Sequence, residues 1–472
     1  MTATTRHPSP PPGFGFRDGT PLAELFVGFF RRDLLAFFPQ TRFEPMVGGA
    51  GAEPGGGPIF RLVEAALDGE DDRVEIFGVR FAVAPRAGGR FSANDRRLIR
   101  AIGAVLALRH HHVFRIGQAP RLELFRGGSD DHYVAAFVEP EAYAPTSNRP
   151  SRIAATIHTL RTAALSTYEN RRVSTGALLL GPGDDPEHPA RPTPLDALTY
   201  GVELTALKSV HRLCDGRRTL FLVDAQGKLA AIADVARWAG PVASGGEVPC
   251  ARTYTAHARA TRTCGHVCVV LSPNQEIKLF AEGAQAFAFA HGRWRVLDSA
   301  AKYAVWREAV ADVAVARVLF QTALDLAEHR QGGLFVVVND PSEAVGRLVA
   351  SHDLLDDDAP PCGPPAELAP GDPLAKRALH YLARGQSVSA LDPPVLEALA
   401  GLDGALVTDR AGRLLAFGAI LRHDPAFLPS MITAEGARTT AALVASHFGP
   451  VLKVSEDGLV SCFLNGSRVW DL

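Results

Sequence analysis

The sequence predicts an α/β protein with two related domains, each a mixed sheet flanked by helices, after a small N-terminal α/β domain. Three observations support this fold class. Short apolar runs alternate with stretches of helical periodicity. Three segments recur in the same order in the middle and last thirds of the chain. A helix with a capping-box start closes the N-terminal part. The chain has 472 residues, which is the length of roughly three domains.

Composition excludes several classes of protein. Apolar residues make up 47% of the chain and charged residues 21%, as in ordinary globular proteins. The net charge of −2 argues against a strongly basic surface for bulk nucleic acid. No apolar run is long enough to span a membrane, and the first residues lack the apolar core of a signal peptide. Six scattered cysteines do not suggest a disulfide framework. We therefore expect a cytoplasmic protein with no membrane partner.

The N-terminal part is expected to hold a disordered tail and a small domain. Residues 1–20 are rich in proline and glycine, which predicts the tail. Residues 21–145 are expected to form an α/β sensory domain. Within it, 22–38 has helical spacing of Leu and Phe, and 73–77 and 79–84 are strand-like.

A second helix of this domain begins after Ser92. Ser92 is followed three residues later by Asp95, which is the spacing of a capping box. The expected apolar stripe of the helix consists of Leu98, Ile99, Ile102, Val105 and Leu106. A helix of this pattern at the end of an α/β unit resembles the end of a GAF-type sensory domain.

Three pairs of segments indicate an internal duplication. Each pair shares a pattern: helix, glycine and apolar strand; a hairpin with an Asp-containing turn; and a strand followed by an acidic turn. The pairs are 163–180 with 322–338, 219–230 with 405–416, and 277–294 with 452–469. We therefore expect related domains at 150–300 and 305–472, linked by a helix over 303–329. The proline-rich stretch 355–372 is expected to be a surface insertion in the second domain.

The second domain carries a set of residues suited to phosphate chemistry. Asp403 and Glu456 are candidates for holding Mg²⁺ or Mn²⁺ through carboxylate oxygens. Gly404 and Ala405 have little side chain, so backbone can approach a nucleotide closely. The guanidinium of Arg438 is suited to a bidentate phosphate contact. Taken alone, Asp403-Gly404 reads as a plain turn before a strand.

In their order and surroundings, these residues resemble the diadenylate cyclase (DAC) domain. Residues 327–338, AEHRQGGLFVVV, are similar to the entry strand of that family. Leu402-Asp403-Gly404-Ala405 falls at its Asp-Gly-Ala motif. Residues 436–442, GARTTAA, fall where it has Gly-Thr-Arg-His-Arg-Ala-Ala, and 454–461, VSEDGLVS, where it has Val-Ser-Glu-Glu-Thr-Gly-x-Ile-Ser.

The resemblance implies an activity and a set of roles. The domain would condense two ATP molecules into the second messenger cyclic di-AMP, as in bacterial signalling, with Mg²⁺ or Mn²⁺ as cofactor. Two nucleotide sites must face each other, which implies a homodimer or higher oligomer. The internal duplication offers the alternative that both copies face each other within one chain. Catalysis and metal binding would fall to Asp403 and Glu456. Nucleotide binding would fall to Gly404, Ala405, Arg438, Thr439 and Ser455.

One motif departs from the family pattern. Where the family has Thr-Arg-His-Arg, this chain has Ala437-Arg438-Thr439-Thr440. An imidazole and a guanidinium are lost, and each missing charge-assisted contact costs about 1.5–3 kcal/mol of phosphate binding. Two alternatives follow: a cyclase, or a weak or inactive DAC-like sensor that binds nucleotide. Arg422-His423 is a candidate substitute for the lost charge.

The first copy is further from the family pattern. Cys214-Asp215-Gly216 is similar to Asp-Gly-Ala but lies three residues early relative to the hairpin. Residues 280–283 are aligned with 454–457, and the basic stretch 257–262 lies near the nucleotide-loop position. We interpret this copy as a degenerate DAC-like sensor domain, with nucleotide binding there as an alternative.

Overall fold

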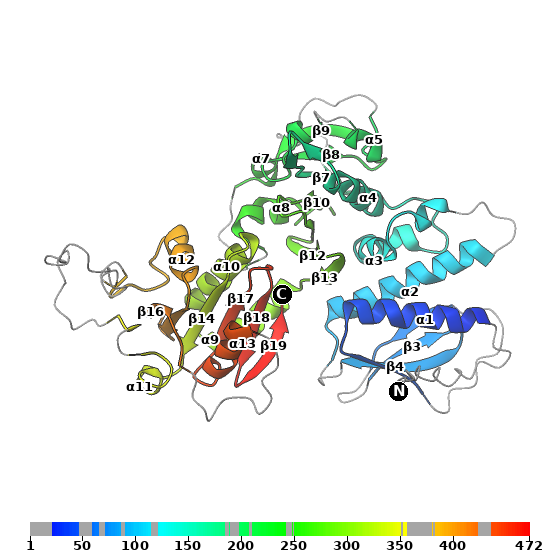
Figure 1. Ribbon diagram of the computed structural model, residues 1–472. Helices are drawn as coiled ribbons and strands as arrows, with labels where there is room; N and C mark the ends of the chain where they lie inside the picture. Colours follow the sequence, from blue (N-terminus) through cyan, green and yellow to red (C-terminus); the bar gives the residue numbers. More distant parts are fainter. Residues whose placement is uncertain are drawn as a thin grey trace, which may run out of the picture. The chain divides into compact units, whose positions relative to one another are not determined.

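The residues that the structure describes form an α/β structure whose strands make four sheets. Figure 1 shows its ribbon. A computed structural model describes residues 21–46, 59–65, 71–85, 90–114, 121–184, 188, 198–206, 210–241, 248, 250–350, 353–355, 380, 383–422 and 436–472. The stretch 356–372 of the expected insertion, the tail 1–20 and His423 lie outside these residues.

Contacts between residues divide the chain into two compact units. The first contains Met1–Trp238, Thr263–Glu282 and Ala286–Val296. The second contains Ala239–Arg262, Gly283–Gln285 and Leu297–Leu472. The segment Ala239–Arg262 therefore belongs to the second unit, although the strands before and after it belong to the first.

The N-terminal sheet has four antiparallel strands in the order β1-β4-β3-β2. The strands are β1 (Thr41–Pro45), β2 (Phe60–Val63), β3 (Asp72–Ile76) and β4 (Val79–Pro85). Phe77 and Gly78 both have positive φ at the turn between β3 and β4, which suits a tight hairpin. The strands expected at 73–77 and 79–84 are confirmed to within a residue at each end.

Two helices complete this part, α1 (Pro21–Phe37) and α2 (Ala93–Phe114). The capping box of α2 is confirmed. The Ser92 amide donates to Asp95 Oδ2 at 2.9 Å, and the Asp95 amide donates to Ser92 Oγ at 3.0 Å. All five residues of the expected apolar stripe are buried. The start of α2 is thus encoded locally, and its orientation follows from its stripe.

The first repeat contains a seven-stranded sheet in the order β13-β12-β11-β10-β7-β8-β9. Its strands are β7 (Thr175–Leu179), β8 (Thr219–Val223), β9 (Leu229–Asp234), β10 (Val267–Leu271), β11 (Ile277–Ala281), β12 (Ala284–Ala290) and β13 (Arg293–Val296). The short strands β5 (Thr167–Tyr168) and β6 (Arg171–Arg172) form a separate ribbon. The helical elements of this stretch of the chain are η1 (Leu122–Phe125), α3 (Ser129–Val138), η2 (Pro140–Tyr143), α4 (Arg152–Ala164), α5 (Val202–Thr205), α6 (Val210–Leu213), α7 (Val235–Ala239), η3 (Arg252–Tyr254) and α8 (Thr255–Ala260). Of these, η3 and α8 belong to the second unit.

The second repeat contains a six-stranded sheet in the order β16-β15-β14-β17-β18-β19. Its strands are β14 (Gly333–Val338), β15 (Ala405–Asp409), β16 (Leu414–Ala419), β17 (Val451–Val454), β18 (Val460–Leu464) and β19 (Ser467–Asp471). Its helices are α9 (Ser299–Val310), α10 (Val313–Glu328), α11 (Pro341–Ala344), α12 (Pro393–Ala400) and α13 (Gly436–Ala445).

The two sheets share one topology. From β9 to β12 and from β16 to β19 the strands follow the same order. Within the described strands, each sheet has a parallel pair that joins the first strand of the repeat to the second, β7 with β8 and β14 with β15. Ala177 pairs with Phe221 and Val269, just as Phe335 pairs with Leu406 and Leu452. The strand pattern of the duplication therefore extends to the register.

The Asp-containing hairpin is the same in both repeats. The amide of Gly227 donates to the carbonyl of Asp224 at 3.1 Å, and the amide of Gly412 donates to that of Asp409 at 3.1 Å. Both glycines have φ near +80°, which a side chain would strain. The Asp and Gly that identify this segment in the sequence are thus the residues that close the turn.

The third sequence match is wrong by one strand. The sequence comparison aligns the strand at 277 with the strand at 452, whereas the sheets equate β10 with β17 and β11 with β18. The turn 455–459 corresponds to 272–276, and the Ser455 and Ser272 amides each donate across their turn, at 2.9 and 2.8 Å. Residues 280–283 therefore do not correspond to 454–457. Repeated hairpins look alike in sequence, so only strand pairing distinguishes them.

The helix expected over 303–329 is two helices. It breaks at Ala311, whose φ is +71°, and Asp312 caps α10 by accepting a hydrogen bond from the Val315 amide at 2.9 Å. An Asp followed by an apolar run is a start signal within a longer helical pattern.

Each unit has its own hydrophobic core. In the first unit one continuous cluster runs from Phe26 and Phe30 of α1 to Trp294 of β13. In the second, a cluster from Leu334 to Phe463 covers β14 and its neighbours. Within the described ranges, none of the helices combines the length and hydropathy needed to cross a bilayer.

Candidate functional site

The topology of the second sheet gathers the predicted site residues at one edge. β14 and β15 run parallel, so their N-terminal ends share an edge, and Asp403 and Gly404 precede β15 there. β17 is antiparallel to β14, so its C-terminal end, with Ser455 and Glu456 after it, reaches the same edge. Arg438 comes from the first turn of α13, which contacts β17 and β14.

The guanidinium of Arg438 lies between the two predicted carboxylates. Its Nη2 is 3.9 Å from Asp403 Oδ1, and its Nη1 is 3.9 Å from Glu456 Oε1. The side chain of Arg438 is 35% exposed, that of Asp403 94% and that of Glu456 77%. Ion pairs this long and exposed stabilise a fold by less than about 1 kcal/mol. The stability of the fold therefore depends little on the charges of Arg438, Asp403 and Glu456.

Glycines at two positions let these residues approach. A Cβ on Gly332 would lie 2.2 Å from Arg438 Nη1, so the guanidinium rests over a bare backbone. Gly404 has a φ of +107°, and a Cβ there would lie 2.4 Å from the carbonyl carbon of Gly418. Ala405 is buried at the start of β15. The turn that carries Asp403 is thus set by backbone packing.

The two predicted hydroxyl ligands already have partners. Thr439 is buried, and its Oγ1 accepts a hydrogen bond from Lys453 Nζ at 2.9 Å. The Ser455 hydroxyl donates to the carbonyl of Leu459 at 3.1 Å within its own turn. A hydroxyl keeps a further lone pair, so a second bond to a ligand remains open to each. In the folded chain Thr439 thus connects α13 to β17, and Ser455 closes its own turn.

Sequence reasoning missed Lys453 and the role of Gly332. Lys453 is the one charged residue in the buried strand β17, VLKV, and a lone lysine in such a run is a usable signal. Its ammonium donates to Thr439 on α13, the residue that follows Arg438, so a second cation lies against that helix. Arg422, the suggested substitute for the lost charge, instead donates from Nη1 to the carbonyl of Gly346 at 2.8 Å.

Asp403 and Glu456 would give a metal ion only two carboxylate ligands from the protein. Among the described residues, no cluster of three or more His, Cys, Asp or Glu side chains is arranged to hold a metal ion. Mg²⁺ bound by nucleotide enzymes commonly takes one or two carboxylates, with phosphate oxygens and water completing its shell. Asp403 and Glu456 fit that pattern, with Arg438 at 3.9 Å from each.

The first repeat lacks both carboxylates. The shared register places Arg218 at the position of Asp403, and the shared turn places Pro273 at that of Glu456. Asp215 lies three residues before Arg218, as expected, and its Oδ1 accepts the amides of Arg217 and Arg218 at 2.9 and 2.7 Å. Its carboxylate therefore closes a local turn.

Burial works to raise the pKa of Asp215, but hydrogen bonds from the amides of Arg218, Thr219 and Arg217 outweigh it and lower the pKa well below its usual range. A carboxylate held in this way stays ionised at neutral pH and is already saturated with donors.

Comparisons with known proteins give limited similarity. No protein-family model matches the sequence, and no curated protein matches it. Among solved structures, a double mutant of DacA from Staphylococcus aureus is 15% identical, covers 34% of this chain and 86% of its own, and has a TM-score of 0.22. A hypothetical membrane spanning protein from Bacillus cereus is 18% identical, covers 36% and 88%, and has a TM-score of 0.21. Such scores do not establish a common fold, so we base the function on the side chains of the site.

Proposed function

We propose that the second repeat binds ATP beside Asp403, Arg438 and Glu456, and condenses two ATP molecules into cyclic di-AMP with release of pyrophosphate. The observation that carries this proposal is the position of Arg438, within 3.9 Å of both carboxylates from separate turns. These three residue types match the DAC-like motifs of the sequence.

The reaction needs positioning and charge neutralisation more than covalent chemistry. The 3′-hydroxyl oxygen of one ATP forms a bond to the α-phosphorus of the other, and the bond from that phosphorus to the β-phosphate oxygen breaks. The hydroxyl proton is released and pyrophosphate leaves. The same step in the opposite sense closes the ring.

Arg438 is suited to hold a phosphate. Its planar guanidinium can bind two phosphate oxygens at once. Its present partners are exposed carboxylates at 3.9 Å, so exchanging them for phosphate costs little. Gly332 leaves the space that the guanidinium occupies.

Asp403 and Glu456 would hold Mg²⁺ or Mn²⁺ together with the phosphates. When bound, the cation supplies charge neutralisation at the α-phosphate and lowers the pKa of the attacking hydroxyl. Gly404 and Ala405 leave backbone free to approach the nucleotide, and Thr439 and Ser455 would add contacts through their remaining hydroxyl lone pairs.

The absence of both carboxylates from the first repeat bears on assembly. Two nucleotides must face each other for both bonds to form, and Arg218 and Pro273 replace the acidic pair in the first repeat. The second site would therefore come from another copy of this chain, which favours a homodimer at least.

A binding-only sensor is the second candidate. Thr439 and Thr440 replace charged residues of the family motif, and the Thr439 and Ser455 hydroxyls already have intramolecular partners. These features favour binding with weak or no turnover.

Incubation with ATP and Mn²⁺ tests both candidates. We expect wild type to form a cyclic dinucleotide, and Asp403→Asn and Glu456→Gln to abolish it. Glu308→Gln on α9, an exposed carboxylate, is the matched control and should retain activity. Calorimetric binding of ATP without product would support the sensor. Neither binding nor product, under conditions where a known cyclase works, would exclude both.

A further inference from the structure

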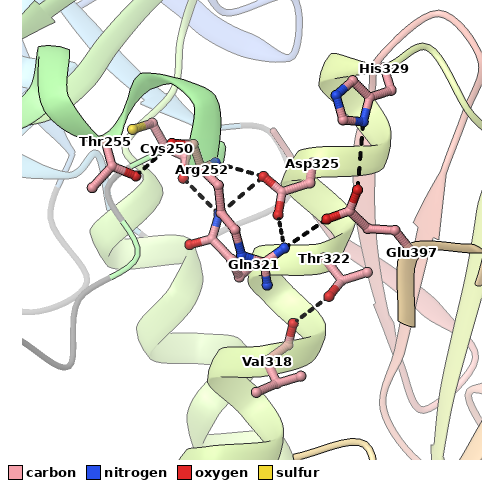
Figure 2. Close-up of polar contacts among 9 residues, drawn as sticks. All are labelled: Cys250, Arg252, Thr255, Val318, Gln321, Thr322, Asp325, His329 and Glu397. Carbon is pink, nitrogen blue, oxygen red and sulfur yellow. Dashed lines mark hydrogen bonds and ion pairs between the residues drawn. The ribbon is translucent and has the colours of Figure 1, made fainter. Parts of the chain in front are cut away.

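A cluster of charges in the second unit lies away from the candidate site. Arg252 of η3 reaches Asp325 of α10 and Glu397 of α12 (Figure 2). The Arg252 amide donates to Asp325 Oδ1 at 2.6 Å, and its Nη1 donates to Asp325 Oδ2 and to Glu397 Oε1, the latter at 2.8 Å. One arginine thus binds two helices of the second repeat at once.

Neighbouring groups complete the cluster. Gln321 Nε2 donates to the carbonyl of Cys250 at 3.0 Å, which holds the segment before η3 on α10. His329 Nδ1 lies 3.7 Å from Glu397 Oε2 (Figure 2). The Asp325 side chain is only 5% exposed, so it depends on Arg252 for charge compensation.

The two helices joined by Arg252 both lead into the candidate site. α12 ends at Ala400, and Asp403 follows the turn at Gly401, whose amide donates to the carbonyl of Glu397 at 2.9 Å. α10 ends at Glu328, four residues before Gly332, on which Arg438 rests.

The segment that follows α10 also packs against the end of α12. A Cβ on Gly333 would lie 3.2 Å from the carbonyl oxygen of Ala400, and one on Gly401 would lie 3.5 Å from Gln331 Oε1. A change in the spacing of α10 and α12 would therefore shift Asp403 and Arg438, because the backbone between them is closely packed.

We propose that Arg252 is a positioning residue for the site: by bridging Asp325 and Glu397, it sets the spacing of α10 and α12, and with it the distance from Asp403 to Arg438. Arg252 lies in the segment between β9 and β10 of the first repeat, and this segment belongs to the second unit. The segment that carries Arg252 is joined through the chain to β9 and β10 of the first repeat, and Arg252 binds the two helices that lead to the site through hydrogen bonds and ion pairs. The ATP-binding measurement that tests this inference rests on the proposed function.

The test compares Arg252→Ala, Arg252→Lys and Glu397→Gln with wild type in the full chain. Arg468→Ala on the edge strand β19 is the matched control, because Arg468 is 32% exposed and pairs with Asp471 at 3.7 Å. Hydrogen exchange is followed at 400–406 and at the first turn of α13, and ATP affinity is measured with Mn²⁺. Thermal midpoints report global stability.

We expect Arg252→Ala to accelerate exchange in both segments and to weaken ATP binding on the order of tenfold. Glu397→Gln should affect 400–406 more than α13, because it leaves the Asp325 pair intact. Arg252→Lys should restore part of both effects, since a lysine can pair with one carboxylate at a time. Arg468→Ala should change neither.

The outcomes separate the two proposals. If wild type fails to bind ATP, the proposed function is wrong, and the exchange measurement still decides the role of Arg252. If Arg252→Ala lowers the thermal midpoint but exchange at 400–406 matches wild type, Arg252 is merely structural and the inference is overturned. Unchanged ATP affinity in a folded Arg252→Ala variant that binds ATP would overturn it as well.

Discussion

The backbone of Gly404 passes so close to Gly418 on β16 that a Cβ on Gly404 would lie 2.4 Å from the Gly418 carbonyl carbon. Asp403 owes its position to this contact, because the turn before β15 can form only without a side chain at residue 404. Its φ of +107° adds a second restriction.

Gly404→Ala is therefore expected to destabilise the second unit by about 2 kcal/mol or more, through backbone strain and overpacking, and to weaken nucleotide binding. Denaturant unfolding measures the first effect and calorimetry the second. Gly385→Ala is the matched control: its φ is also positive, at +66°, but no atom lies within 4 Å of the added Cβ. Equal losses in the two variants would show that the contact with Gly418 is unimportant.

Arg438→Ala should weaken ATP binding by about 1.5–3 kcal/mol, the value of a hydrogen bond to a charged group. Stability should change little, because both ion pairs of Arg438 are long and exposed. Arg438→Lys should recover only part of the affinity. Arg410→Ala, which removes an exposed arginine bonded to Asn339 at 2.9 Å, is the control. Unaltered affinity in Arg438→Ala would contradict a phosphate contact.

Asp325 should make stability depend on pH. Burial raises the pKa of Asp325 to about 6, although the hydrogen bond from the Arg252 amide and the positive charge of Arg252 act to lower it. A carboxyl whose pKa is raised in the folded state stabilises the fold when protonated. That contribution is present below the ordinary pKa of 3.8 and is lost as pH rises through about 6.

Asp325→Asn cannot ionise, so the difference in free energy of unfolding between wild type and this variant should fall as pH rises from 4 to 6.5. Unfolding in denaturant at several pH values measures it, with Glu308→Gln as the exposed control. A constant difference across this range would show that Asp325 titrates as it does in the unfolded chain.

Asp215 should make the stability of the fold depend on pH in the opposite direction. Its pKa is lowered because the amide hydrogen bonds outweigh burial. Such a carboxylate stabilises the fold above the ordinary pKa, and the contribution is lost as pH falls below about 4. Asp215→Asn should therefore destabilise the first unit at pH 7 and approach wild type in acid.

The exposed residue Glu44 of β1 supplies the control for Asp215, as Glu44→Gln. A penalty for Asp215→Asn that persists unchanged in acid would contradict this role. Nucleotide binding should be unaffected, because the Asp215 carboxylate is already occupied by backbone donors.

The capping box of α2 should contribute measurably to the first unit. Ser92→Ala removes the acceptor of the Asp95 amide and is expected to cost about 1 kcal/mol. Ser92→Asp keeps an acceptor at this position and should restore most of the stability. Equal stability of Ser92→Ala and wild type in denaturant unfolding would indicate that the helix start is held by packing alone.

Local signals predicted the parts of the fold that are encoded locally. Ser92 and Asp95 mark a helix start because their side chains satisfy nearby amides. The Asp-Gly turns at 224–227 and 409–412 were recognised in both repeats for the same reason. The sequence does not reveal the break at Ala311, although Asp312 after it is a cap, because apolar residues continue on both sides.

The strand register could not be predicted from the sequence. Hairpins of one repeat resemble each other, so 280–283 was aligned with 454–457 when its true counterpart is one strand away. The roles of Lys453 and Gly332 were also hidden, since each depends on a residue distant in the chain that packing brings near.

The amino-acid sequence by itself determined that this chain is an α/β protein with a duplicated strand pattern, and it singled out Asp403, Arg438 and Glu456. Only the tertiary structure decided that these three side chains meet at one edge of the second sheet, and that Arg252 joins the helices leading to them. The reason is physical: turns and caps are satisfied by neighbours in sequence. Long-range pairing instead depends on which strands exchange hydrogen bonds and which helices share a buried charge.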